Sequence, residues 1–427
     1  MYKKINIINL SFGLAIFLLF LQRSTTFFEV IGIGSVLSRW TLRPASLLLI
    51  LAAYYSVKKE SQGLNIIQER YRFWLKGLIF WLIILVFYGL FQKSPFRLII
   101  NDLQVMLFFI VGIFIGARKE NWYFIEKTYI NVLFFGLLVN VFAISMIPNI
   151  SRNFTYNSIA YKIQYLIWPV LFFLLTVNFR RDKKIKFLII TVYVINIIEQ
   201  LIFQKRLELF KFIVILFPLF IIIKSNKIRP FRFGNKVAIL LTILMIFYAS
   251  VNITIGYNLD IFSSWDMIMN RFMGNYGVVE TTTEDNRWKM AGVVIDNIRG
   301  HEILIGKGLG SYIADTRLHW NASVGYEEAF LGVTEIEVGH VWPYWKGGII
   351  LFFFLNSIFI FIMFSYKNYK NNPFLIICWS VVTMQFFYFF SGAWSSEDVF
   401  SMILLGLCIG QCISAQPVDV NELYGTK

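Results

Sequence analysis

The sequence predicts an all-α, polytopic membrane protein with about twelve transmembrane helices and one large outer loop that contains short helices. Hydrophobic residues make up 57% of the chain and charged residues only 15%, and the mean hydropathy is +0.64. Soluble proteins carry about 25% charged residues. Apolar stretches of about 20 residues, the length that crosses the hydrocarbon core of a bilayer, recur along the whole chain. One long polar segment, residues 256–346, interrupts them.

Each predicted span is an apolar run bounded by basic or turn-forming residues, as expected where a helix reaches the membrane surface. In order, the spans are residues 5–21, 41–57, 73–91, 98–116, 128–147, 163–179, 187–203, 209–223, 237–255, 347–364, 374–390 and 399–413. The first span lacks a small-residue cleavage site, so we expect a retained signal anchor. The chain therefore divides into spans 1–9 (residues 1–255), the outer loop (256–346), and spans 10–12 with a cytoplasmic tail (347–427).

The distribution of Lys and Arg predicts which side each connection faces. With the N-terminus inside, the short inner segments carry 23 of these residues and the short outer segments carry 10, when the first four residues of the adjoining spans are counted with them. Because basic residues accumulate in cytoplasmic loops, both termini are predicted to be cytoplasmic and the outer loop to face the periplasm or cell exterior. The same bias accounts for the net charge of +15. These residues form no continuous face, which argues against nucleic acid as a partner.

The outer loop contains one clear helical pattern followed by a glycine-rich turn. Asp285 is placed to cap a helix that ends near Gly300, with apolar residues at helical spacing between them. Arg287 lies at the start of this helix, where its charge opposes the helix dipole, and this argues against a purely structural role. Gly308 and Gly310 follow in the sequence Gly-Lys-Gly-Leu-Gly. They form either a plain tight turn or a place where two backbones approach closely.

Cationic residues at the outer ends of the spans are candidates for binding a phosphorylated group. Lys205 and Arg206 lie in a very short outer turn between two apolar spans, with Glu199 at the end of the preceding span. A packed pair of cations suits a diphosphate, since Arg presents a fork of donors to phosphate oxygens. Arg97 lies at the start of another span. The alternative is that these are ordinary interfacial residues whose charged ends reach water.

His340 and Glu337 are candidates for a general base. They are three residues apart, so they share a helix face if the tenth span begins early. A carboxylate can orient a neighbouring imidazole and raise its basicity. The alternative is that His340 belongs to an aromatic belt with Trp342 at the membrane interface. The three histidines and three cysteines of the chain show no metal-ligand spacing, so we expect no metal site and no cofactor.

The residues from Arg287 to Gly310 resemble the loop pattern of the bacterial O-antigen polymerase and ligase superfamily of GT-C-like membrane glycosyltransferases. That pattern is an Arg-led helix and a short apolar step into a Gly-x-Gly turn. Further on, the family has a polar catalytic residue and then a span opened by Gly-Ile, which Gly348 and Ile349 match. A basic pair in a short outer turn is matched by Lys205 and Arg206. The overall arrangement of spans and loop is also similar.

The resemblance implies glycosyl transfer on the outer face of the bacterial inner membrane. The expected donor is a glycan on undecaprenyl diphosphate, and the expected product is O-antigen or a related surface polysaccharide. Arg287, Arg97 and the basic pair of the outer turn would bind the diphosphate, and His340 or Glu337 would act as the base. Other residues are expected to line the substrate site: Glu199, Gly308, Gly310 and Trp342. Membrane lipids, a chain-length regulator and a flippase of the same pathway are the expected partners.

One departure from the family bears on the reaction. Ligases of the family usually show His-Asn about eleven residues before the Gly that opens the next span. Here Glu337 stands eleven residues before Gly348, and Val341 follows His340. The lack of His-Asn favours a polymerase over a ligase that transfers polymer to lipid A core. A polysaccharide flippase or other permease without enzymatic activity is the third alternative.

Overall fold

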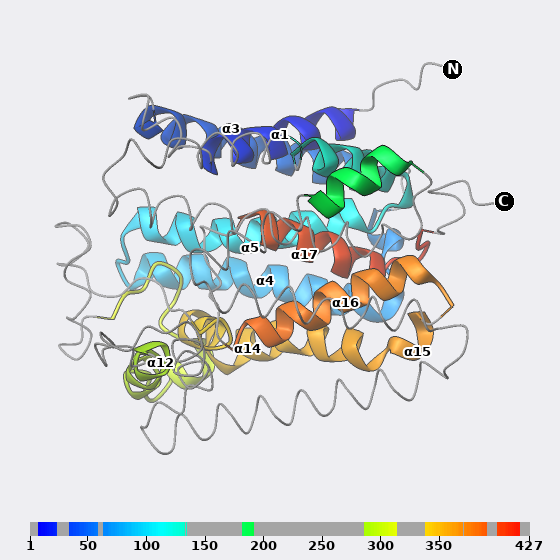
Figure 1. The fold of residues 1–427 in the computed structure, drawn as a ribbon. Coiled ribbons are helices and arrows are strands. Elements are labelled where there is room, and N and C mark those ends of the chain that lie inside the picture. The colour runs from blue at the N-terminus through cyan, green and yellow to red at the C-terminus, as the bar shows by residue number, and fades with distance from the viewer. Residues whose placement is uncertain are drawn as a thin grey trace, which may run out of the picture.

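The computed structural model describes residues 7–23, 34–58, 63–132, 134, 182–191, 286–313, 338–369, 371–390 and 399–418. Over these residues the secondary structure is helical, apart from one isolated antiparallel bridge between Ile67 and Ser414 (Figure 1). The all-α part of the prediction is therefore confirmed. Predicted spans 5–9 lie almost entirely outside the described residues, as do Lys205, Arg206 and Glu199.

The named helices of the N-terminal part are α1 (Ile7–Arg23), α3 (Gly34–Lys58), α4 (Glu69–Phe91) and α5 (Phe96–Gly116), with short 3-10 turns η1 (Gly63–Ile66) and η2 (Lys119–Asn121). The later helices are α12 (Asn286–Asp296), α13 (Glu302–Ile305), α14 (Val341–Phe364), α15 (Tyr366–Tyr369), α16 (Pro373–Tyr388) and α17 (Val399–Cys412). Further helical stretches cover residues 122–132 and 183–191. The start of α16 shows how sequence sets a boundary: Asn372 caps it by accepting from Phe374 N at 3.0 Å, and Pro373 opens the first turn.

The helices are those of a membrane protein by length and composition. Among the described residues, α4, α5 and α14 are long and apolar enough to cross a bilayer, and four shorter apolar helices accompany them. Within the most apolar stretch of α4, α5 and α14, only about one third to one half of the residues are buried inside the protein. A helix whose outer face is apolar and exposed needs lipid around it. The predicted start of span 10 at residue 347 falls inside α14, which begins at Val341.

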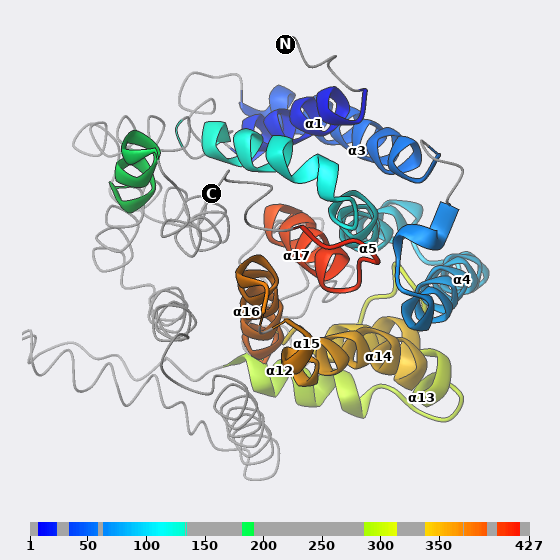
Figure 2. The same ribbon diagram turned by 90° about the vertical axis from the view of Figure 1, so that its right-hand side faces the viewer.

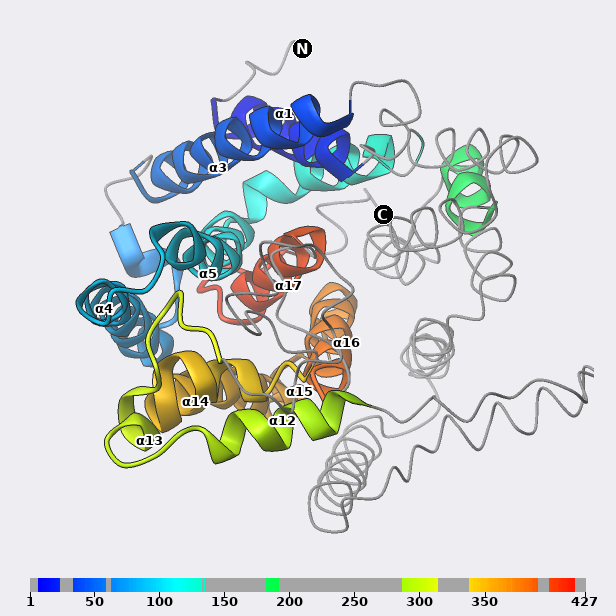
Figure 3. The same ribbon diagram turned by 90° about the vertical axis from the view of Figure 1, so that its left-hand side faces the viewer.

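The helices pack as a bundle, which Figures 2 and 3 show from its two ends. The largest contacts join α5 to α17 and α1 to α3, and α14 packs against both α4 and α16. The α4–α5 turn, α12, α13 and the start of α14 lie at the left end in Figure 1, and α15 lies at the right end. The segments after η1, α5 and α17 meet at the end opposite α12, where Ser414 Oγ donates to Ala117 O at 2.6 Å. The predicted topology, in which successive spans cross the membrane in opposite directions, places these three segments on the same side.

Four glycines allow α5 and α17 to approach closely. Gly112 and Gly116 on α5 face Gly406 and Gly410 on α17, and each pair is four residues apart. A Cβ atom on Gly116 would lie 2.5 Å from Leu407 Cα, closer than real Cβ contacts come. Two small-xxx-small motifs that face each other are a common means of packing membrane helices. This interface was not predicted from the sequence, although the Gly-x-x-x-Gly spacing is present in both spans.

This interface predicts that Gly116→Ala destabilises the protein. The added methyl group meets the backbone of α17, which cannot move aside as a flexible side chain could, so we expect a loss of about 1–3 kcal/mol. The matched control is Gly292→Ala on α12, where a Cβ would meet nothing within 4 Å. That change should be neutral or should stabilise by up to about 1 kcal/mol, because glycine is unfavourable inside a helix. Thermal unfolding in detergent measures both, and equal midpoints for Gly116→Ala and the parent would contradict the interface.

Candidate functional site

The helix α14 is broken at Gly348, which has φ 64° and ψ −165°. We call residues 341–347 the half-helix; the longer part of α14 follows the break. His340 directly precedes the half-helix, and its ring lies within hydrogen-bonding reach of Asn356 in the longer part. A straight helix would separate these two residues by about 24 Å. The chain therefore turns back at Gly348, so that the half-helix and the longer helix converge.

The glycine-rich loop 306–311 supplies backbone partners to the broken helix. Lys307 N donates to Trp345 O at 2.8 Å, and Gly308 N donates to Lys346 O at 3.0 Å. A helix break leaves carbonyls without their usual intrahelical donors, and a lipid environment offers no water to replace them. The loop therefore satisfies the end of the half-helix. Trp81 Nε1 on α4 donates to a third carbonyl, that of Gly347, at 3.3 Å.

Three positions of this loop require glycine. Gly306, Gly308 and Gly310 all have positive φ, between 71° and 85°. A Cβ on Gly306 would lie 2.5 Å from Gly347 N, and one on Gly310 would lie 2.7 Å from Ile99 N. Of the two interpretations that the sequence left open, close backbone approach is the one observed. The loop packs between the break in α14 and the adjacent ends of α4 and α5.

A buried ion pair lies beside this loop. Lys346 Nζ is 2.9 Å from Asp102 Oδ2 on α5, and the two side chains are only 1% and 11% exposed. Asp102 Oδ2 also accepts from Gly310 N at 2.7 Å, and Lys346 Nζ donates to Ser311 O at 2.7 Å. The ammonium group lies 4.0 Å from the centre of the Trp345 ring. Lys346 was not among the predicted site residues, although a lysine directly before Gly347 and Gly348 at a span boundary was a usable signal.

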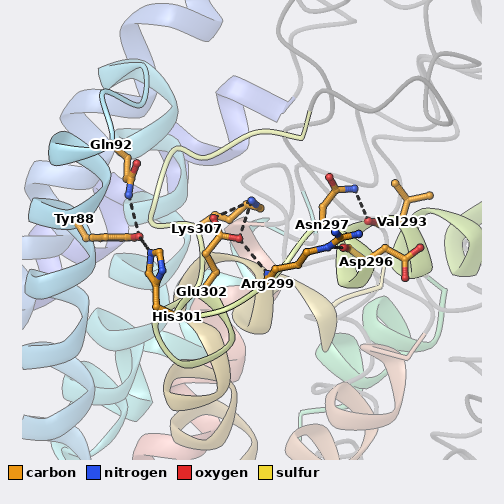
Figure 4. A network of polar contacts seen from close by, with 9 residues as sticks. All are labelled: Tyr88, Gln92, Val293, Asp296, Asn297, Arg299, His301, Glu302 and Lys307. Atoms are coloured by element: carbon orange, nitrogen blue, oxygen red, sulfur yellow. Dashed lines mark hydrogen bonds and ion pairs between the residues drawn. The ribbon is translucent and has the colours of Figure 1, made fainter.

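A second polar cluster lies nearer the surface (Figure 4). Glu302 Oε2 and Lys307 Nζ form an ion pair at 2.9 Å, with about a quarter of each side chain exposed. Tyr88 OH on α4 is 3.3 Å from His301 Nε2, and Gln92 Nε2 donates to the same hydroxyl at 2.9 Å. These contacts tie α13 to the end of α4. His301 therefore bridges two elements and is exposed, rather than lining a buried site.

His340 is buried against aromatic rings of α16 and the turn after it. Its Nε2 lies 2.9 Å from the carbonyl oxygen of Phe386, and its ring packs edge-on against Phe386 and Phe390 at centroid distances of 4.8 and 4.3 Å. Because a carbonyl only accepts, Nε2 carries the proton and Nδ1 is left as the basic nitrogen. Burial lowers the pKa of His340 to about 4, which the hydrogen bonds to Phe386 and Asn356 only partly oppose.

The other predicted site residues are placed as follows. Arg287 is the second residue of α12, and Arg97 is exposed as the second residue of α5. Trp342 is buried in the half-helix, and Gly308 and Gly310 are buried in the glycine-rich loop. Glu337 lies outside the described residues.

The helix α12 brings Arg287 to the same part of the bundle as His340. It packs against α14, and Figures 2 and 3 show it running crosswise from the α16 side of the bundle toward α13 and α4. Its inner face is apolar, with Ala291 and Val294 buried, and Ile298 is buried just after its end. Arg287 lies at the α16 end of α12, and His340 packs on the aromatic rings at the end of α16.

Comparison with protein-family models and with curated proteins gives no match for this chain.

The burial of His340 predicts a specific loss of stability in acid. The pKa of an unfolded histidine is about 6.5 and that of folded His340 is about 4, so the unfolded chain takes up a proton first as the pH falls. Stability from the neutral buried ring is complete above pH 6.5 and is lost between pH 6.5 and about 4. Between pH 7 and 5, the parent should lose about 2 kcal/mol more than His340→Gln. Unfolding measured at both pH values tests this, and parallel losses would mean that His340 is not buried as a neutral group.

Proposed function

We propose that the chain is a membrane glycosyltransferase that polymerises oligosaccharide repeat units carried on undecaprenyl diphosphate. The reaction would take place on the outer face of a bacterial inner membrane and yield O-antigen or a related surface polysaccharide. The observation that carries the proposal is that α12, the helix of Arg287, packs against α14, which begins directly after His340, at one end of an apolar bundle. A lipid-linked diphosphate needs its charge met at the edge of the membrane while its lipid remains in the bilayer.

The reaction requires two kinds of group. A hydroxyl of the acceptor unit attacks the anomeric carbon of the donor glycan, the bond from that carbon to the diphosphate oxygen breaks, and undecaprenyl diphosphate leaves with the electron pair. A base takes the proton of the hydroxyl, and cations stabilise the charge that grows on the leaving diphosphate. His340 through Nδ1, with Glu337 orienting it, would be the base. Arg287, together with Lys205, Arg206 and Arg97, would bind the diphosphate.

The ion pairs at this end of the bundle bear on which cation would stabilise the leaving diphosphate. Lys346 is neutralised by Asp102 and buried, and Lys307 is paired with Glu302. A cation that is already paired stabilises an added anion less than an unpaired one does. Of the two predicted cations that the structure describes, Arg97 lies on α5 and Arg287 lies on α12, which packs against α14. We therefore assign Arg287 the largest share of the charge stabilisation.

A permease is the alternative from a different class. Ionisable residues inside membrane proteins often mark transport pathways, and Asp102 with Lys346 is such a pair. Both groups here are bonded to each other and to the loop backbone, an arrangement that suits a structural role more than a moving ion. A ligase to lipid A core would share the donor chemistry and differ in its acceptor.

The assignment of Arg287 predicts a large loss of transfer on its removal. Arg287→Ala should lower kcat/KM for a lipid-diphosphate donor by about 100-fold or more, the effect of removing one donor to a developing anion. Arg287→Lys should recover part of this at best, because the fork of donors is lost. The matched control is Arg299→Ala, which removes an exposed cation just beyond the other end of α12 and should stay within about threefold of the parent. Equal activities of Arg287→Ala and Arg299→Ala would remove Arg287 from the reaction.

The assignment of the base predicts an order among three variants assayed as purified protein. His340→Ala and His340→Gln should both lose transfer by about 100-fold or more, because Gln can still donate to Phe386 O but has no basic nitrogen. Glu337→Gln should leave a measurable remnant. If Glu337→Gln is the more damaged, the carboxylate is the base and His340 supports it. Parent-like rates in all three would return both residues to the aromatic-belt interpretation.

A further inference from the structure

The ion pair of Asp102 and Lys346 joins three parts of the chain that are far apart in the sequence. Asp102 lies on α5 and Lys346 lies at the end of the half-helix, next to the break at Gly348. Each of them makes a second bond to the loop: Asp102 to Gly310 N and Lys346 to Ser311 O. The pair therefore fixes the loop to α5 and to α14 at the same time.

Because the pair is buried, removal of either charge is expected to break the connection between the loop, α5 and α14. A protein tolerates two buried charges when they form an ion pair and when their other hydrogen-bonding atoms also have partners. Here both conditions hold, with Nζ and Oδ2 2.9 Å apart and a backbone partner on each side. If one charge is removed, the other is left buried without compensation, and it can reach water only if the loop leaves its place.

The half-helix connects this pair to His340. Lys346 is near its C-terminal end and His340 directly precedes its first residue. A half-helix of this length is rigid, because its backbone is hydrogen-bonded within the helix and, at its end, to Lys307 N and Gly308 N. The position of its C-terminal end therefore sets the position of the histidine ring against α16.

We infer that Asp102 and Lys346 are a positioning pair that holds the glycine-rich loop and the half-helix in place, and through them the ring of His340. The pair itself does not bind substrate. Its effect on loop docking is independent of the proposed function, whereas its effect on transfer rests on that function.

The test measures docking of the loop by the reactivity of a cysteine. In Ser311→Cys, the new thiol replaces a buried side chain and leaves the backbone carbonyl that Lys346 binds. The three native cysteines are buried, so their background labelling by a polar maleimide is low. In this parent, Asp102→Asn or Lys346→Gln alone should speed labelling at least about tenfold, because a lone buried charge expels the loop. The double variant, which removes both charges, should return to within about threefold of the parent.

Glu302→Gln is the matched control. It breaks the partly exposed pair with Lys307, four residues from Ser311, and should change labelling by less than about twofold, since exposed pairs contribute little. Unchanged labelling in both single variants, or a double variant that labels as fast as the single ones, overturns the positioning pair. If the single variants do not survive purification, recovery of folded protein in the double variant supports the pair, and its failure overturns it.

The same variants in the transfer assay separate this inference from the proposed function. Positioning predicts that the single variants lower kcat with little change in KM, and that the double variant regains most of kcat. A parent that transfers no sugar, combined with the predicted labelling pattern, leaves the positioning pair standing and removes the proposed function. A transfer-active parent whose single variants keep full kcat while the loop is released overturns the link from the pair to His340.

Discussion

The break in α14 leaves backbone carbonyls without donors from the same helix, and neighbouring segments at this end of the molecule supply those donors. The carbonyls of Trp345, Lys346 and Gly347 receive their hydrogen bonds from the glycine-rich loop and from Trp81 rather than from the next turn of the helix. A loop can come this close only if it lacks side chains at the points of contact, which explains the glycines with positive φ. Asp102 and Lys346 then join the loop, α5 and α14 through charge. Residues 306–311 are thereby held on the bundle.

Two lysines near the glycine-rich loop are neutralised by carboxylates, and the histidine beside the half-helix is uncharged. Asp102 and Lys346 neutralise each other in a place that water does not reach, and Glu302 and Lys307 do so nearer the surface. His340 is kept neutral by burial, with its tautomer fixed by the carbonyl of Phe386. A neutral imidazole suits proton abstraction from a hydroxyl more than direct binding of an anion. The low pKa also weakens one reason for preferring histidine over Glu337 as the base, namely that an ordinary imidazole titrates near neutral pH.

The sequence predicted the features that depend on local pattern. The apolar runs that became α4, α5 and α16 were located to within a few residues, because long hydrophobic helices are defined by composition alone. The helix after Asp285 was also predicted, from the spacing of its apolar residues, but it ends at Asp296 rather than near Gly300. What the sequence did not predict depends on contacts between distant segments: the pairing of Asp102 with Lys346, and the glycine interface of α5 with α17. The turn at Gly348 was missed for a related reason, since a glycine between apolar residues also fits a continuous helix.

The central claim is that this end of the bundle carries out glycosyl transfer between lipid-linked units. The most direct measurement incubates the purified protein in vesicles with a single substrate, the oligosaccharide repeat unit on undecaprenyl diphosphate, and follows both chain length and released lipid diphosphate. The account predicts lipid-linked chains of increasing length, with one undecaprenyl diphosphate released for each unit added. Transfer that begins only when a lipid A core acceptor is added would identify a ligase instead. Recovery of the donor unchanged, but moved across the vesicle membrane, would contradict the claim and identify a permease.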